Sequence, residues 1–165
     1  MAHNAYLSIT GEKQGLISSG CNTKDSLGGK YQEGHINEIS VIATEHSMMK
    51  FTGEHRNTHN PITITKFIDK SSPLLNTAFA RQEYLDCTLK FYRTNEQGYN
   101  ENHYTIELKK ALITQIGLSQ PHSIQAHDEE MTEQVSLSYK SIVWKHNIGG
   151  TEGYSDWETT YEQQS

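Results

Sequence analysis

The stretch from Ile62 to Leu75 constrains the fold most strongly, because it predicts a strand that runs directly into a helix. Apolar and polar side chains first alternate, which is typical of a strand with one buried face. The apolar positions are Ile62, Ile64 and Ile68, and the polar positions are Thr63, Thr65 and Asp69.

The helix that follows is predicted over about residues 73–82. Ser72 can accept a hydrogen bond from a free backbone N–H at the helix start, and Pro73 suits the first helical position because its missing N–H costs nothing there. Four apolar residues at helical spacing then predict one buried stripe: Leu74, Leu75, Ala78 and Phe79.

The rest of the chain is predicted to consist mainly of strands, at Tyr6–Thr10, Leu16–Ser18, Ile36–His46, Leu85–Thr94, His103–Ile116 and Gln134–Lys145. Loops are predicted at Gly20–Gly34, His46–Asn60 and Gly117–Glu133, with a tight turn at Asn95–Gly98 and a glycine-rich tail from Asn147. In the strand His103–Ile116 the apolar phase shifts, which predicts a β-bulge near Lys109 and Lys110.

These elements together predict a mainly β fold, namely a small β-barrel of two antiparallel sheets with one flanking α-helix. The chain has 165 residues, a length that suits one domain with a real core. We therefore expect a single domain over residues 1–165 that ends in a short C-terminal tail.

Charge and hydropathy exclude several partners. The chain has 20 acidic and 14 basic residues and a net charge of -6, which argues against binding nucleic acid through a basic field. No apolar run approaches the length that spans a bilayer, so no membrane insertion is expected. The N-terminus lacks the basic and apolar segments of a secretory signal. We expect the chain to fold in a cytoplasm and, if it leaves the cell, to leave by another route.

The two cysteines have different sequence surroundings. Cys87 alternates in phase with Leu85 and Leu89, which predicts a small core residue. Cys21 lies in a polar segment rich in glycine and asparagine, and we expect it to be exposed. No disulfide is expected between them in a reducing compartment.

The nine histidines raise the question of a metal site. His55 and His59 are four residues apart, which on a helix would place both on one face. Gly53 and Pro61 instead make this segment a loop, and the chain has no phosphate-binding loop or nucleophile motif. We therefore expect no metal site, no cofactor and no catalytic residues.

The loop His46–Asn60 carries apolar residues without strand alternation, namely Met48, Met49 and Phe51. These side chains either fold back onto the core or form an exposed patch, and the sequence leaves both readings open. Exposed apolar clusters commonly mark contact surfaces, and methionine adapts to an imperfect fit.

Several short motifs follow one another in a specific order and spacing. They are Tyr6-Leu7-x-Ile9, Glu45-His46, the loop positions Gly53, Arg56, His59 and Pro61, the junction Thr65-Lys66-x-Ile68-Asp69-Lys70-Ser71-Ser72-Pro73, the strand Leu89–Arg93 with Tyr104, and Val135-x-Leu137-x-Tyr139-x-x-Ile142-x-Trp144 with Ser155-Asp156-Trp157. In these motifs the chain resembles the haemolysin-coregulated protein family, Hcp, the tube protein of the bacterial type VI secretion system.

The resemblance implies a structural protein rather than an enzyme. Six copies would close into a ring, and rings would stack into a hollow tube that a contractile sheath expels, with a spike protein at its tip and effector proteins in its lumen. A head-to-tail contact of this kind uses two different patches. The subunit would begin in the bacterial cytoplasm and be secreted to the extracellular space or a target cell.

The candidate ring-stacking loop carries Met48, Met49, Phe51, Gly53, Arg56 and His59. The other positions that match the family motifs are Glu45, His46, Lys66, Asp69, Ser72, Pro73, Tyr92 and Trp144. Two other classes of function remain open from the residues alone. One is a ligand- or sugar-binding β-sandwich with Trp144 or Trp157 as a stacking platform, and the other is a hydrolase that uses the histidine-rich loops.

Overall fold

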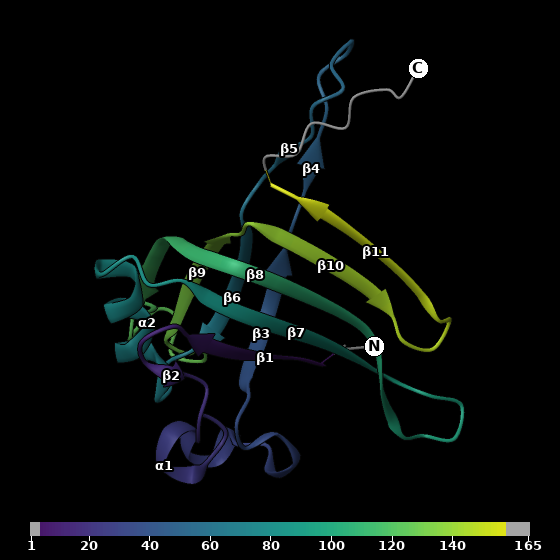
Figure 1. The fold of residues 1–165 in the computed structure, drawn as a ribbon. Helices are drawn as coiled ribbons and strands as arrows, with labels where there is room; N and C mark the ends of the chain where they lie inside the picture. The colour runs from purple at the N-terminus through teal and green to yellow at the C-terminus, as the bar shows by residue number, and fades with distance from the viewer. Residues whose placement is uncertain (1–3, 158–165) are drawn as a thin grey trace.

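The computed structural model describes residues 4–157, and its fold is mainly β, as predicted (Figure 1). The strands are β1 (Asn4–Gly11), β2 (Gly15–Leu16), β3 (Ile39–Glu45), β4 (Met48–Met49), β5 (Thr58–His59), β6 (Ile62–Phe67), β7 (Leu85–Thr94), β8 (Asn100–Ser119), β9 (Thr132–Ser138), β10 (Ser141–His146) and β11 (Thr151–Asp156). The helices are α1 (Lys24–Leu27) and α2 (Ser71–Ala80), with short 3₁₀ turns at Gly28–Lys30 and Glu33–His35.

The wall of the fold is one antiparallel sheet that closes on its long strand β8. Its order is β11-β10-β8-β7-β1-β3-β6-β9, and β9 pairs again with β8. The 20-residue strand β8 makes this closure possible, because its first half pairs with β7 and β10 while its second half pairs with β9. The hairpin β4-β5 forms a separate two-stranded sheet.

The predicted bulge in the long strand is confirmed. Leu85 lies opposite Ala111 and Cys87 lies opposite Leu108, so the register shifts between these pairs. Lys110 has a φ of 48°, in the left-handed region that a non-glycine residue rarely adopts. The bend that such a bulge gives a strand lets β8 leave β7 and turn toward β9.

Three predicted segments differ in the structure. The segment Gln134–Lys145 is two strands, β9 and β10, rather than one, and Tyr139 and Lys140 connect them. The glycine-rich tail forms β11, which pairs with β10 along its whole length. The predicted loop Gly20–Gly34 contains α1 and the 3₁₀ turn Gly28–Lys30, and it runs into the 3₁₀ turn Glu33–His35 at its end, so this glycine-rich segment includes short helical turns.

The core lies inside the closed sheet and under α2. It includes Leu7, Ile9, Ile39, Ile64, Leu75, Leu89, Ala111, Val135 and Ile142. Cys87 is buried there as predicted, whereas the expectation that Cys21 is exposed is wrong, because Cys21 is also fully buried. Both cysteines are free, and burial raises the pKa of the Cys21 thiol to about 11 and that of the Cys87 thiol to about 12. In residues 4–157 no helix is long and apolar enough to cross a membrane.

A buried charge cluster fixes the junction between β6 and α2. Lys66 occupies the inward register of β6, in phase with Ile62 and Ile64, and its side chain is fully buried. Its ammonium contacts the carboxylate of Glu133 on β9 and lies 3.1 Å from that of Asp69. The sequence predicts Glu133 as the last residue of the loop Gly117–Glu133, but it is a buried residue of β9.

Ser72 joins this cluster instead of capping the helix, so the predicted cap is wrong. The hydroxyl of Ser72 donates to Glu133 at 2.7 Å and accepts from the backbone N–H of Asp69 at 3.0 Å. The helix begins at Ser71, and its free N–H group there donates to the carboxylate of Asp69 at 2.8 Å. Asp69 therefore satisfies the helix start, a role for which short acidic side chains are suited.

The stripe predicted on the helix is only half buried. Leu75 and Ala78 lie in the core, but Leu74 and Phe79 remain 38% and 41% exposed. Pro73 lies in the first turn and is exposed. The helix thus buries a narrower stripe than its four apolar residues suggest.

We expect that replacing Lys66 by Met lowers the free energy of unfolding by about 3–5 kcal/mol, because it leaves Glu133 and Asp69 buried without a counter-charge. Urea denaturation of the two proteins measures this difference. Lys109→Met, an exposed change on β8, should cost less than about 0.5 kcal/mol.

Adding Asp69→Asn and Glu133→Gln to Lys66→Met should recover part of the loss, because the uncompensated charges are then gone. An Lys66→Met protein as stable as Lys109→Met would show that the charge cluster contributes nothing to the fold.

Candidate functional site

The segment between β3 and β6 is a hairpin that stands away from the closed sheet (Figure 1). Met48 pairs with His59 and Met49 with Thr58, while Asn60 donates two hydrogen bonds to Ser47. The predicted loop His46–Asn60 is therefore an ordered hairpin with two short strands. Its end turns at Gly53, whose φ of 85° favours glycine.

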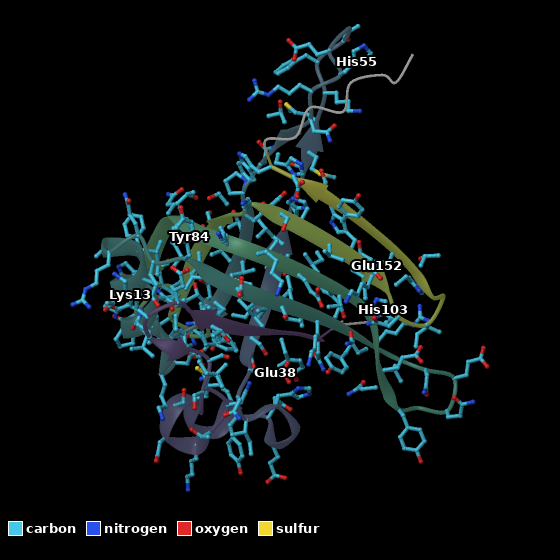
Figure 2. The ribbon with its side chains drawn as sticks, viewed as in Figure 1. Lys13, Glu38, His55, Tyr84, His103 and Glu152 are labelled. Atoms are coloured by element: carbon cyan, nitrogen blue, oxygen red, sulfur yellow. The ribbon has the colours of Figure 1, made fainter. Side chains whose placement is uncertain are left out.

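The apolar residues of this hairpin do not fold back onto the core. Met48, Met49 and Phe51 are 46%, 50% and 59% exposed. Arg56 is exposed as well, and Figure 2 shows His55 near the far end of the projection. Of the two readings that the sequence left open, the structure supports the exposed patch, which is the kind of surface that marks a contact site.

A groove of about 390 Å³ lies between the hairpin and the sheet. Met48 and Met49 line one side, and Trp144 of β10 and Tyr154 of β11 line the other. Trp144 is half-buried and packs against the core, while Tyr154 is 74% exposed. The exposed apolar surface of the hairpin thus continues onto the last two strands.

The base of the hairpin is held by a cluster of aromatic and hydroxyl groups, the histidine–tyrosine clamp, made of His46, His59, Tyr139 and Ser155. The Tyr139 hydroxyl lies 2.8 Å from Nε2 of His46 and 2.7 Å from Nδ1 of His59. Nε2 of His59 lies 3.1 Å from the Ser155 hydroxyl. His59 is buried, so this one residue of the predicted loop is an anchor and not part of the exposed patch.

Burial in the clamp favours neutral side chains. Desolvation lowers the pKa of His46, and the nearby His59 lowers that pKa further. Desolvation also lowers the pKa of His59, although Asp156 opposes the shift. The pKa of Tyr139 is raised by burial. A neutral hydroxyl between two neutral imidazoles can donate to one ring and accept from the other.

The remaining motif positions lie elsewhere. Glu45 is exposed at the end of β3, next to the clamp, while Lys66, Asp69 and Ser72 form the buried charge cluster. Tyr92 of β7 contacts Tyr6 and His35 edge-on, and the rings of Tyr6 and His35 stack at 3.6 Å. The motif positions therefore lie in separate places in the fold, with Trp144 in the groove beside the hairpin, and the structure does not bring them together.

No metal centre is found in the described part of the chain. Residues 4–157 contain no group of three or more potential metal ligands. His55 and His59 differ completely in setting, since His55 is exposed and His59 is buried in the clamp. Trp157 packs against His59 and Tyr139 rather than standing free as a platform for a sugar.

Sequence reasoning missed the roles of Tyr139 and Ser155 in the clamp. It also missed the pairing of Lys66 with Glu133, for which a signal was present. Lys66 shares the inward phase of Ile64, and Glu133 shares that of Val135, so two opposite charges occupied core positions of strands that could pair.

Comparisons with known proteins agree on one family. Residues 6–146 match the family described as "Type VI secretion system effector, Hcp". The "Major exported protein" of Pseudomonas aeruginosa strain PAO1 is 39% identical across 96% of this chain and 98% of its own length.

Solved structures give the same result. A crystal structure of an Hcp protein superposes with a TM-score of 0.90 at 34% identity, covering 96% of this chain and 99% of the other. The secreted protein Hcp3 from Pseudomonas aeruginosa superposes with a TM-score of 0.85 at 38% identity, covering 96% of this chain and all of its own.

The clamp predicts that stability depends on pH in the histidine range. The unfolded chain takes up protons on its histidines near pH 6.5, whereas burial keeps His46 and His59 neutral to lower pH. Their contribution is therefore fully present above about pH 6.5 and is lost as the pH falls toward the lowered pKa values.

Urea denaturation between about pH 8 and about pH 5 measures this effect, and stability should fall across the interval. Burial alone would raise the pKa of Glu83, but hydrogen bonds from Gln14 and Lys13 lower it overall, so this carboxylate stays ionised above about pH 5. The double variant His46→Gln with His59→Gln should show a flatter profile, while His55→Gln should keep the native one. Equal slopes in all three proteins would contradict the neutral clamp.

Proposed function

Because the chain belongs to the Hcp family of type VI secretion system proteins, we propose that six copies close into a ring and that these rings stack into a hollow tube. Membership of this family makes the chain a secreted structural subunit of the type VI secretion tube and not an enzyme. The observation that carries the proposal for assembly is the projecting hairpin, whose apolar side chains are left uncovered in a single copy.

The hairpin is the proposed contact between stacked rings. Met48, Met49 and Phe51 offer apolar surface, and Arg56 adds a cation that can pair with an acidic surface. Burying one such apolar side chain contributes about 1.5–3 kcal/mol. Six symmetric copies on one ring face would multiply this contribution, so even a small patch per copy gives a stable stack.

Ring closure requires a second kind of contact between neighbours, because a head-to-tail arrangement uses two different patches. The chain has further exposed apolar side chains away from the hairpin, on α2 and just after it. They are Leu74, Phe79 and Tyr84. These residues supply surface for a contact distinct from the hairpin, as a closed ring demands.

The proposed lumen carries effector proteins, and the outer faces of β6 and β9 have a composition that suits its wall. Thr63 hydrogen-bonds to Ser136 at 2.8 Å across the two strands, and Thr65 lies opposite Gln134. This face offers hydroxyl and amide groups without charge, so it would hold a passing protein weakly. A contractile sheath around the tube and a spike at its tip complete the proposed set of partners.

The proposed route runs from the cytoplasm of a bacterium, where the subunit folds, through the type VI machinery to the extracellular space or a target cell. The two classes left open by the sequence have no comparable support. Trp157 packs against His59, Trp144 packs partly against the core, and residues 4–157 contain no group of three or more potential metal ligands.

We expect the purified protein to be a hexamer in dilute solution. Static light scattering after size-exclusion chromatography measures the native mass, which should be six times that of the 18.7 kDa chain. A strictly monomeric species at every concentration tested would exclude the ring.

We expect Phe51→Ala combined with Arg56→Ala to leave rings intact but to weaken stacking and abolish export. Native mass and the amount of subunit in the culture medium measure the two effects. Ile124→Ala combined with Lys24→Ala is the matched control, because it also removes one exposed apolar and one exposed basic side chain.

The behaviour of the hairpin variant distinguishes a contact between rings from a contact within one ring. Dissociation of the hairpin variant into monomers would place the hairpin in the contact within a ring. Normal stacking and normal export would show that the hairpin takes no part in assembly.

A further inference from the structure

The hairpin has few hydrogen bonds with which to hold a fixed direction. Its two arms are joined to each other by the pairs Met48–His59 and Met49–Thr58 and by the bonds between Asn60 and Ser47. These bonds shape the hairpin but do not attach it to the sheet. Its attachment through side chains comes from the base, where each arm contributes one histidine.

The two histidines reach the same atom. His46 lies at the start of the first arm, and His59 lies on the second. Both imidazoles contact the Tyr139 hydroxyl, His46 at 2.8 Å and His59 at 2.7 Å. Tyr139 is buried at the connection between β9 and β10, which is part of the closed sheet. One hydroxyl thus ties both arms of the hairpin to the wall of the fold.

The clamp is extended on the side of His59. Its other nitrogen contacts the Ser155 hydroxyl at 3.1 Å, and its ring stacks on Trp157 with centroids 5.6 Å apart. Asp156 is the acidic group that faces His59, while the charged form of His46 would be opposed by His59. The direction of the hairpin therefore depends on β11 as well as on Tyr139.

The number of protons on Tyr139, His46 and His59 decides whether both hydrogen bonds to the hydroxyl can form. The Tyr139 hydroxyl has one proton, so it can donate to one imidazole while accepting from the other. A single extra proton can be accommodated on either histidine without breaking these bonds. When both are protonated, both nitrogens donate to the hydroxyl, its own proton has no acceptor, and two cations face each other across it.

We propose that the Tyr139 hydroxyl positions the hairpin for contact with a second copy of the chain, and that protonation of both His46 and His59 releases it. This inference rests on the proposed role of the hairpin in ring stacking. Tyr139 acts here as a positioning residue, because it reaches the contact surface only through the two histidines.

The test uses the full chain and two readouts across about pH 8 to about pH 5. Light scattering reports stacking of rings. Tryptophan fluorescence, measured in a Trp144→Phe background that leaves Trp157 as the one remaining tryptophan, reports the clamp itself, because an imidazolium that forms at His59 quenches the emission of Trp157.

In the native chain, fluorescence should fall as His59 takes up a proton, and stacking should fall at the same pH or a lower one, where both histidines are protonated. Both midpoints should lie below the value of about 6.5 for a free imidazole. The Tyr139→Phe variant should still form rings. At neutral pH these rings should stack as weakly as the native rings do in acid. His46→Gln with His59→Gln should stack at both ends of the range, because an amide can bond to the hydroxyl but takes up no proton. His55→Gln, at the exposed end of the hairpin, should behave as the native chain does (Figure 2).

Native-like stacking of Tyr139→Phe at every pH, or loss of stacking in acid by the double glutamine variant, would overturn the inference. Failure of the assembly role gives a different result. If the hairpin takes no part in assembly, rings of the Phe51→Ala, Arg56→Ala variant stack normally, while the tryptophan fluorescence of the native chain still changes with pH. If Tyr139→Phe does not fold, the comparison of the native chain with the double glutamine variant decides the question.

Discussion

The fold depends on a single buried cation. Lys66 has no access to water, and its charge is tolerated because Glu133 and Asp69 surround it. The three residues belong to three places, since Glu133 lies on β9, Asp69 precedes α2 and Lys66 lies next to the last residue of β6. A buried charge is tolerated only when its partners are present. Arrangements in which β6 and α2 meet differently would leave these charges unpaired and would therefore be less stable.

The same junction fixes where the hairpin leaves the sheet. The hairpin connects β3 to β6, and β6 is held by pairing with β9 as well as by Lys66. The clamp then uses Tyr139, the residue after β9, to hold the hairpin base. Both ends of β9 therefore carry a polar anchor, one for the helix and one for the projection, and a shift in the register of this strand would disturb both together.

Local patterns predicted the elements whose signal is local. The strand Leu85–Thr94 has the predicted bounds, and the phase shift before Ala111 correctly located the bulge. The split between β9 and β10 was missed because Val143 continues the odd-numbered apolar phase of Val135 and Leu137. The buried residue of β10 is instead Ile142, so the inward phase shifts between the two strands. β11 was missed because its stability comes from β10 and not from its own glycine-containing sequence.

Side-chain burial was predictable only where one strand decides it. Cys87 follows the phase of its own strand, whereas Cys21 is buried by elements that a polar, glycine-rich segment does not reveal. His59 looked like its exposed neighbours because its hydrogen-bond partners, Tyr139 and Ser155, lie 80 and 96 residues further along the chain. Contacts at such separations follow from the closed path of the sheet and not from any local spacing.

The burial of both cysteines has a consequence for a subunit that is exported. Thiolates are the species that exchange disulfides and oxidise, and the raised pKa values of Cys21 and Cys87 keep both groups as unreactive thiols near neutral pH. A folded subunit can therefore pass from a reducing compartment to an oxidising one without changing its covalent structure. The two thiols of such a protein stay unchanged in either redox environment, and they need no oxidative maturation.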